Sequence, residues 1–340
     1  MRLFMSCLLF ISLLISCQKN NEPEWLGLKI PSNFPAPVQK IEDLNITKAG
    51  FELGRKLFYD PLLSKDNTIS CGSCHNQGSA FTHHGHDVSH GINDLLGRRN
   101  ALPVQNLLWQ NSFFWDGGVA HIDLISINPI QNPVEMDETL PNVLNKLRLH
   151  KEYPIMFESA FGDTTINSTR FLQAMTQFMA LLISADSKYD LAMRAEGPSL
   201  SLEEKEGKAL FDKHCASCHS GELFSDFSFR NNGMISNHQE DKGRYEISLL
   251  PNDLGKFKVP SLRNIAKTAP YMHDGSLNSL EDVLNHYTTG ISASPTLDSN
   301  LVVHNKPGLQ INLDQQKKII LFLHTLTDEK FLRKQEFSEQ

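Results

Sequence analysis

Two short motifs constrain this chain more than any other feature of its sequence. Each has the pattern C-x-x-C-H, in which two cysteines are followed directly by a histidine. The residues concerned are Cys71, Cys74 and His75, and Cys215, Cys218 and His219. This pattern attaches c-type haem. Two thiols one helical turn apart can add to the two vinyl groups of one porphyrin, and the next residue, a histidine, then faces the iron. The sequence therefore predicts two covalently bound haem c groups.

Other uses of paired cysteines explain the pattern less well. A C-x-x-C pair also occurs in redox dithiols and in zinc sites, and cysteines of exported proteins often form disulfides. A redox dithiol does not require the histidine, and a four-cysteine zinc site would leave His75 and His219 without a role. The chain has six cysteines, and the other two, Cys7 and Cys17, lie in the N-terminal segment. No cysteine outside that segment is left over, which favours haem.

The N-terminal segment predicts export. Arg2 precedes an apolar run at 3–15 that is too short for a comfortable membrane span. The run ends in the sequence LISC at 14–17, which resembles the lipobox of bacterial lipoproteins. We therefore expect cleavage before Cys17, lipidation of that cysteine, and a periplasmic protein that meets the membrane through its lipid anchor only. An ordinary signal peptide that is cut nearby, or a retained anchor, remains the alternative.

Composition limits the partners and allows two domains. With 340 residues, of which 40% are hydrophobic, the chain can bury two modest cores. Its formal net charge of −7 argues against a nucleic-acid partner, because phosphate binding requires a basic surface.

The pattern along the chain predicts a mostly α fold made of two cytochrome c-like haem domains with long loops. We expect a signal peptide at 1–17, a tether at 18–45, an N-terminal domain at 46–196 and a C-terminal domain at 197–330. Helical periodicity predicts helices at 46–59, 139–149, 168–183, 279–287 and 312–326. A capping box at 201–204 predicts a further helix before the second motif. Residues 76–135 are expected to form loops around a cofactor, and no strand pattern is convincing. Because each motif follows a helix, the two domains suggest a duplication.

Seven further stretches carry a resemblance to a known family. They are DNTIS at 66–70, RNALP at 99–103, FWDG at 114–117, QNPVEM at 131–136, DKGR at 241–244, VPSLRN at 259–264 and TAPYMHDG at 268–275. With these stretches and the two haem motifs, the chain resembles the bacterial di-haem cytochrome c peroxidases, including their MauG-like branch, from about residue 45 to 328. The resemblance implies that peroxide reacts at the N-terminal haem. It also implies that the C-terminal haem accepts electrons from a small carrier, such as a reduced cytochrome c or a cupredoxin.

The resemblance also assigns roles to single residues. Glu135 matches the family's distal acid/base, which would move a proton from the inner to the outer peroxide oxygen; a surface glutamate in a loop is the alternative. Trp115 matches the tryptophan between the haems, where an indole can relay an electron; it can also be a core aromatic. Asn100, with the carbonyl groups of Thr268 and Pro270, matches the family's calcium site, although a calcium ion needs more oxygen ligands than these.

Several positions depart from the family pattern at the N-terminal haem. The distal histidine of members that need reductive activation aligns with Ile92, and His90 lies two residues earlier. Three more histidines are nearby: His83, His84 and His86. One of these histidines could ligate the resting iron, but we favour a haem without a distal histidine. Ile125 stands in place of a glutamine of the peroxide pocket, and Gly118 in place of an arginine.

The C-terminal haem departs as well. Tyr287 occupies the position of the distal methionine, as in MauG-like proteins, and a phenolate ligand would lower the potential of the iron. His286 is the alternative ligand, and a packing role for Tyr287 is the third possibility. His273 matches a histidine near this haem, but no role follows for it.

Together these features predict an enzyme that reduces hydrogen peroxide with electrons from a periplasmic redox protein. The alternative is a MauG-like oxidase that removes electrons from a protein substrate over a long distance, which Tyr287 and the missing distal histidine favour. A simple electron carrier is a third reading, against which Glu135 argues. A homodimer is left open.

Overall fold

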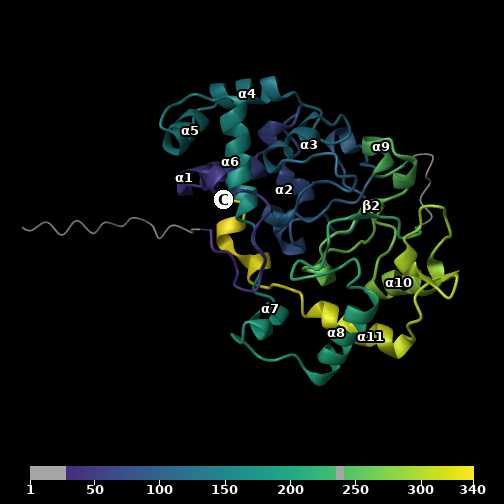
Figure 1. Cartoon of the computed structure of the whole chain (residues 1–340). Helices are drawn as coiled ribbons and strands as arrows, with labels where there is room; N and C mark the ends of the chain where they lie inside the picture. The colour runs from purple at the N-terminus through teal and green to yellow at the C-terminus, as the bar shows by residue number, and fades with distance from the viewer. Residues whose placement is uncertain (1–27, 235–240) are drawn as a thin grey trace, which may run out of the picture.

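The computed structural model describes residues 28–234 and 241–340, which form two lobes (Figure 1). The N-terminal lobe contains α1 (Lys48–Tyr59), α2 (Cys71–Cys74), α3 (Ile127–Gln131), α4 (Leu140–Leu149), α5 (Tyr153–Phe161) and α6 (Ser168–Ala180). The C-terminal lobe contains α7 (Lys188–Met193), α8 (Leu202–His214), α9 (Tyr245–Ser248), α10 (Leu280–Asn285), a π-helical turn (His286–Gly290) and α11 (Leu313–His324). The mostly α fold expected from the sequence is confirmed.

The expected absence of strands is wrong in detail. Strand β1 (Phe229–Arg230) pairs antiparallel with β2 (Phe257–Lys258), and β3 (Val302–Val303) pairs antiparallel with β4 (Lys306–Pro307). Each strand has two residues, which is too short to produce the alternating pattern by which strands are recognised in a sequence.

The helices begin where the sequence places caps. The hydroxyl of Thr139 accepts a hydrogen bond from the backbone of Asn142 at the start of α4. Ser201 and Glu204 form the expected capping box at the start of α8, with both reciprocal hydrogen bonds present. Residues 76–135 are mostly irregular, with short 3-10 turns and α3, as expected for loops around a cofactor.

The same aromatic cluster occurs in both lobes. In the N-terminal lobe, the ring of Phe58 lies 6.0 Å from that of Phe81 and 5.1 Å from that of Phe178. In the C-terminal lobe, the ring of Phe211 lies 5.8 Å from that of Phe224 and 5.2 Å from that of Phe322. Each trio joins the helix before a C-x-x-C-H motif, the segment after the motif, and the last long helix of the lobe, which supports the duplication.

In both lobes a glycine allows these two helices to cross closely. A Cβ atom at Gly54 of α1 would lie 1.9 Å from the carbonyl oxygen of Ala174 in α6. A Cβ atom at Gly207 of α8 would lie 2.0 Å from the carbonyl oxygen of Lys318 in α11. Any side chain at either position would therefore push the two helices apart.

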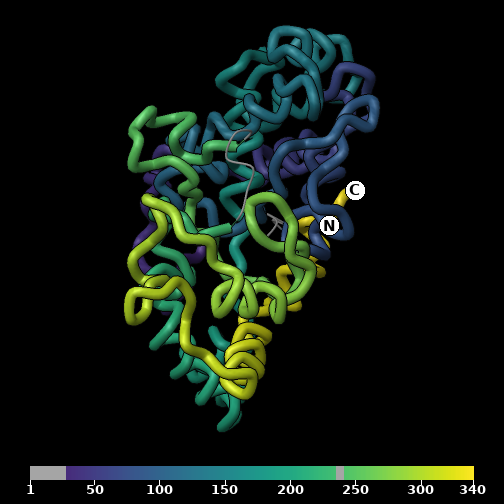
Figure 2. Tube along the Cα trace, turned by 90° about the vertical axis from the view of Figure 1, so that its right-hand side faces the viewer, coloured from purple at the N-terminus to yellow at the C-terminus, as the bar shows by residue number. Residues whose placement is uncertain are grey.

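Segments outside the two expected domains also pack onto them. Phe34, in the segment that we expected to be a tether, is buried and contacts the ring of Trp109 edge-on at 5.0 Å. The C-terminal residues return to the N-terminal lobe (Figures 1 and 2), where the hydroxyl of Tyr59 donates to the carbonyl of Phe337 at 2.8 Å. Up to Ala185 the buried apolar residues belong mainly to the first core, and from Tyr189 on mainly to the second, so the cores change over before Gly197. Leu223 and the C-terminal residues Phe331, Leu332 and Phe337 join the first core.

Buried polar contacts join the two lobes. The side chain of Asn264 donates to Gln105 at 2.7 Å and to Ser184 at 2.9 Å. The backbone carbonyl of Arg263 also accepts from Nε2 of Gln105 at 2.8 Å, and these directional contacts fix the relative position of the lobes. Within the C-terminal lobe, the guanidinium of Arg263 makes two hydrogen bonds of 2.8 Å to the carboxylate of Asp190, and both side chains are fully buried.

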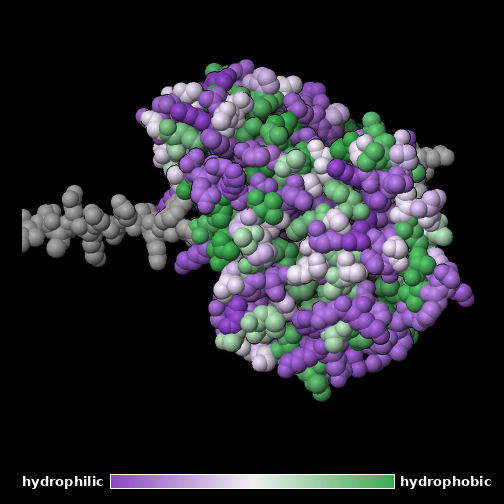
Figure 3. All heavy atoms as spheres, viewed as in Figure 1, coloured by the Kyte–Doolittle hydropathy of each residue, from purple (hydrophilic) through white to green (hydrophobic). Residues whose placement is uncertain are grey.

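The face of the molecule in Figure 3 is mostly hydrophilic, with apolar side chains at the surface around α9, where Ile247, Leu249 and Leu250 are exposed. In the part of the chain that the structure describes, no helix has the length and apolar character needed to span a bilayer. The expected signal segment and Cys17 lie outside the described residues.

Candidate active site

The first C-x-x-C-H motif lies on the single turn of α2. Ser70 caps this turn in a reciprocal pair with Ser73, which fixes the direction of the helix. The Nδ1 atom of His75 lies 2.7 Å from the carbonyl oxygen of Phe81. A carbonyl can only accept, so Nδ1 carries the proton and Nε2 is left with a lone pair for a metal. Burial also lowers the pKa of His75, which keeps the ring neutral.

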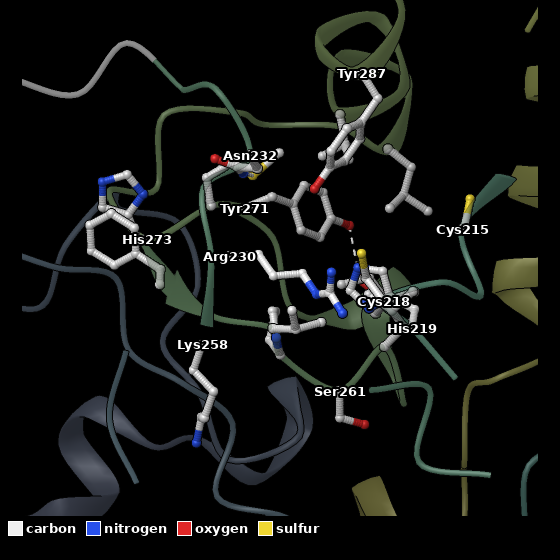
Figure 4. A pocket seen from close by; sticks show the side chains of 18 of the residues that line it. Cys215, Cys218, His219, Arg230, Asn232, Lys258, Ser261, Tyr271, His273 and Tyr287 are labelled. Carbon is white, nitrogen blue, oxygen red and sulfur yellow. Dashed lines mark hydrogen bonds between the residues drawn. The ribbon is translucent and has the colours of Figure 1, made fainter. Parts of the chain in front are cut away.

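The second motif repeats this arrangement. The Nδ1 atom of His219 lies 3.1 Å from the carbonyl oxygen of Phe224, and burial lowers the pKa of the ring. One cavity is lined by Cys215, Cys218 and His219 together with Tyr287 (Figure 4). We call it the second cavity because it adjoins the second motif. Much of its remaining wall is apolar and comes from Leu262, Leu280, Leu284, Leu309, Ile319 and Leu323.

These residues fit a haem at each motif. The four cysteines of the two motifs are not joined in disulfides, so each motif offers two sulfur atoms to a porphyrin. Both histidines are neutral, and each has its Nδ1 bound to a backbone carbonyl, so that the same nitrogen, Nε2, remains for iron. The apolar wall of the second cavity suits a porphyrin face.

Glu135 lies beside the thiols of the first motif. Its Oε1 atom accepts a 2.7 Å hydrogen bond from Nδ2 of Asn132. Burial raises the pKa of the Glu135 carboxyl, and the hydrogen bond from Asn132 partly opposes this. Burial is the main cause of the raised pKa of the Cys71 and Cys74 thiols. The carboxylate of Glu135 adds a smaller rise to the pKa of both. A carboxyl whose pKa is raised, placed next to a haem attachment point, is suited to moving protons near neutral pH.

The loop before Arg99 places an isoleucine, and no histidine, against Glu135. The backbone N–H of Ile92 donates to the carbonyl of Glu135 at 2.8 Å, and the side chain of Ile92 is buried. His90 is instead turned toward Asp94, with its Nδ1 2.5 Å from the carboxylate. Gly91 packs so closely that a Cβ atom there would lie 2.6 Å from Cα of Glu135.

Three histidines of this loop, His83, His86 and His90, meet ring to ring at tilted or edge-on angles. The rings of His86 and His90 lie 4.9 Å apart, and those of His83 and His86 lie 5.4 Å apart. Within residues 28–234 and 241–340, no group of three or more His, Cys, Asp or Glu side chains is arranged to hold a metal ion.

Trp115 lies at the wall between the lobes and lines the second cavity. Its indole Nε1 donates to the carbonyl of Asn100 at 2.8 Å. Its ring meets that of His273 nearly edge-on at 6.4 Å, and His273 in turn stacks on Phe257 at 3.7 Å. No role could be predicted for His273 from the sequence, and in the structure it links the rings of Trp115 and Phe257 in the wall of the second cavity.

Tyr287 and His286 point in different directions. The side chain of Tyr287 projects into the second cavity (Figure 4). Burial raises its pKa to about 12, and the thiols of Cys218 and Cys215 are near enough to contribute to this rise. The Nε2 atom of His286 instead lies 3.0 Å from the carbonyl oxygen of Asn232. Both residues begin the π-helical turn, a feature that often marks functional sites.

The three residues expected to bind calcium also line this cavity. They are Asn100, Thr268 and Pro270. Nδ2 of Asn100 donates to the carbonyl of Asp87 at 3.0 Å, which fixes the orientation of the amide. The three residues offer neutral oxygen atoms only, fewer than the six to eight that calcium takes.

An arginine brings three of the family-like stretches together. The guanidinium of Arg99 contacts Asp116 at 2.5 Å and makes hydrogen bonds of 2.7 and 2.8 Å to Asp241. Arg244 donates to the carbonyl of Asp116 at 2.8 Å. The stretches around 99, 116 and 241 therefore form one ion-pair network behind Trp115, which sequence reasoning did not foresee.

Sequence reasoning also missed Lys258. Its ammonium is buried and bound to Oε1 of Gln110 at 2.7 Å and to the carbonyl of Ser112 at 2.9 Å. Burial lowers the pKa of Lys258 to about 7. Its position directly before the VPSLRN stretch was the available signal.

Of the two substituted pocket positions, Ile125 packs against the first core, and the N–H of Gly118 donates to Asp116 at 2.9 Å.

Comparison with known proteins identifies the family. A profile described as di-haem cytochrome c peroxidase matches residues 48–197. The methylamine utilization protein MauG of Methylorubrum extorquens is 32% identical, over 91% of this chain and 87% of its own. The cytochrome c551 peroxidase of Pseudomonas aeruginosa is 30% identical, over 86% and 83%.

A solved structure supports the same assignment. A crystal structure of a MauG-like protein associated with microbial copper homeostasis superposes with a TM-score of 0.81 at 30% identity. The match covers 91% of this chain and 98% of that one. The chain therefore belongs to the di-haem cytochrome c peroxidase family, which includes the MauG proteins, and it is an oxidoreductase of the peroxidase type.

Proposed function

We propose that this protein reduces hydrogen peroxide to water at its N-terminal haem, with electrons that a small periplasmic redox protein delivers to its C-terminal haem. The placement of Glu135 carries this proposal. A half-buried carboxyl lies close enough to Cys71 and Cys74 to influence both thiols, and a buried isoleucine stands where activation-dependent members have a histidine. Peroxide would therefore find a proton-transferring group and no competing imidazole.

Each haem c would be held through thioethers, by Cys71 and Cys74 in the N-terminal lobe and by Cys215 and Cys218 in the C-terminal lobe. His75 and His219 would ligate the irons through Nε2. When bound, the haems supply the redox chemistry that accepts electrons and delivers them to peroxide.

The protein's own groups would move the proton and guide the electrons. Glu135 would accept the proton from the inner peroxide oxygen and return it to the outer oxygen, which then leaves as water. Asn132 would hold the carboxyl in place through its 2.7 Å hydrogen bond. Trp115, at the wall between the lobes, would shorten the path of each electron. Two electrons and two protons are consumed for each peroxide that yields two waters.

Steady-state kinetics tests this proposal. The mature protein is produced in a host that assembles cytochromes c, and peroxide-dependent oxidation of a reduced monohaem cytochrome c or a cupredoxin is followed. We expect turnover in the parent and a strong loss in Glu135→Gln. No oxidation of any reduced carrier by the haem-loaded parent would refute the proposal. A colourless mature protein would show that no haem is bound, and the proposed reaction would then have no cofactor.

The second candidate is a MauG-like oxidase of a protein substrate. Tyr287 in the second cavity favours it, because a tyrosine ligand would stabilise the oxidised iron. Peroxide titration of the ferric protein separates the two functions. A rapid return to the ferric spectrum on addition of a reduced carrier favours the peroxidase. An oxidised spectrum that persists in the presence of the reduced carrier favours the oxidase.

The remaining expectations belong to the same proposal. A calcium ion would bind Asn100 and the carbonyl groups of Thr268 and Pro270, completed by water, and would brace the wall beside Trp115. Lipidation at Cys17 would hold the protein to a membrane facing the periplasm. Calcium content by mass spectrometry of metals, the mass of the mature N-terminus, and light scattering for a homodimer test these three points.

A further inference from the structure

Asn232 contacts three candidate distal ligands of the second haem. It follows β1 and lines the cavity, and its side chain lies near Tyr287 in Figure 4. The three candidates are a phenol, a thioether and an imidazole, which belong to Tyr287, Met272 and His286. Each of these groups could ligate iron.

The three contacts differ in what they do. The backbone carbonyl of Asn232 accepts from Nε2 of His286 at 3.0 Å, so the lone pair that a metal would need lies on the other ring nitrogen. The amide Nδ2 of Asn232 donates to Sδ of Met272 at 3.3 Å, which occupies a lone pair of the thioether. The side chain of Asn232 also lies near the ring of Tyr287, which projects into the same cavity.

The backbone around Asn232 is firmly anchored. The buried side chain of Asn231 donates to Ser294 at 3.1 Å and to Thr296 at 2.9 Å, and its Oδ1 accepts from the N–H of Gly233 at 2.8 Å. The carbonyl of Gly233 accepts from the N–H of Ser292 at 2.9 Å. Asn232 is therefore held on both sides, as a residue that positions a ligand must be.

We propose that Asn232 is the positioning residue that makes Tyr287 the distal ligand of the second haem and keeps Met272 and His286 away from the iron. This inference rests on the proposed function, because it presupposes a haem on Cys215, Cys218 and His219. It goes beyond that function in naming the residue that selects the ligand, and with it the potential of the haem. Methionine ligation raises the potential of a haem, whereas an anionic phenolate lowers it.

Asn232→Leu tests the inference, because leucine keeps the approximate volume and removes the amide. The backbone carbonyl remains, so His286 stays held while the thioether of Met272 is released. In the haem-loaded protein we expect the phenolate-to-iron absorption band to weaken and the midpoint potential of the second haem to rise. In Asn232→Leu combined with Met272→Leu, the rise is expected to disappear. Asn232→Ala serves if the leucine variant does not fold.

Two control variants separate the possible failures. Met272→Leu alone should leave the band and the potential unchanged, because Tyr287 and the amide are still present. Tyr287→Phe should abolish the band. If it does not, tyrosine is not the ligand, and the assignment of Tyr287 fails together with this inference. If Tyr287→Phe abolishes the band but Asn232→Leu leaves band and potential as in the parent, Asn232 does not select the ligand, and the proposed function stands.

Discussion

The indole of Trp115 is hydrogen-bonded to the carbonyl of Asn100, and the N–H of Asn100 is hydrogen-bonded to the carbonyl of His273. The two hydrogen bonds, Nε1 to the carbonyl of Asn100 and the N–H of Asn100 to the carbonyl of His273, are each 2.8 Å long. Because His273 lines the second cavity, the backbone of a single residue, Asn100, connects the ring of Trp115 to the wall of that cavity. The indole is thereby fixed where an electron passing between the haems would need it.

Replacing Trp115 by phenylalanine should slow electron transfer between the haems. Phenylalanine keeps an aromatic ring but is much harder to oxidise and loses the hydrogen bond to Asn100. We expect the rate of electron arrival at the N-terminal haem to fall about tenfold or more, equivalent to about 1.4 kcal/mol in the barrier. Rapid-mixing absorption spectroscopy after reduction of the second haem measures this rate. An unchanged rate with full haem content would exclude Trp115 as a relay.

Replacing Glu135 by glutamine should remove the proton transfer. General acid–base groups contribute roughly a hundredfold to ten-thousandfold, so the rate of the reaction with peroxide should fall within that range. The amide can still accept from Asn132, which makes the substitution nearly isosteric. Stopped-flow measurement of the reaction between peroxide and the haem-loaded protein provides the test.

The pH profile of the same reaction should show the environment of Glu135. Burial disfavours the charged carboxylate and raises its pKa. The base form is needed to accept a proton, so the rate should fall as the pH drops through this raised pKa, at a higher pH than for an ordinary glutamate. This acidic limb should be absent in Glu135→Gln. If the limb persists in the variant, another group controls it.

Two glycines of one loop offer a matched test of how Glu135 is positioned. A Cβ atom at Gly91 would lie 2.2 Å from the carbonyl oxygen of Val134, whereas at Gly97 its nearest neighbour would be 3.5 Å away. Gly91→Ala should therefore displace the backbone of Glu135 and slow the peroxide reaction, and Gly97→Ala should leave it nearly unchanged. Equal effects of the two substitutions would show that the contact with Gly91 does not position the carboxyl.

The buried pair of Arg263 and Asp190 should contribute strongly to stability. Asp190→Asn leaves the guanidinium of Arg263 buried without its counter-charge, which typically costs about 3–5 kcal/mol. The exposed pair of Lys208 and Asp212, 2.7 Å apart, is the control, and Asp212→Asn should cost only about 0.3–0.5 kcal/mol. Denaturant unfolding of the haem-loaded proteins measures both changes. A loss below about 1 kcal/mol for Asp190→Asn would mean that water or a neighbour compensates the charge.

The parts of this protein whose chemistry is local could be predicted from the sequence alone. Two thiols and an imidazole within five residues identify a haem attachment site wherever they fold. Caps such as Ser201 and apolar periodicity likewise depend on neighbours within a turn or two, so α1, α4, α6, α8 and α11 lie where they were expected. The family-like stretches singled out Glu135, which influences the thiols of the first motif, and Trp115, which lines the second cavity. Their roles in the reaction stay predictions.

Which of several neighbouring side chains points into the second cavity or toward Glu135 depends on the tertiary structure. His286 and Tyr287 are adjacent in sequence, yet one is turned to the backbone of Asn232 and the other into the cavity. His90 is turned toward Asp94, while Ile92 packs at Glu135. The orientations of His286 and Ile92 depend on contacts with residues far away in the chain, Asn232 and Glu135, whereas the partner of His90 is only four residues away. The direction of a side chain is set by what it packs against, and where that partner is distant, no pattern of nearby residues contains the information.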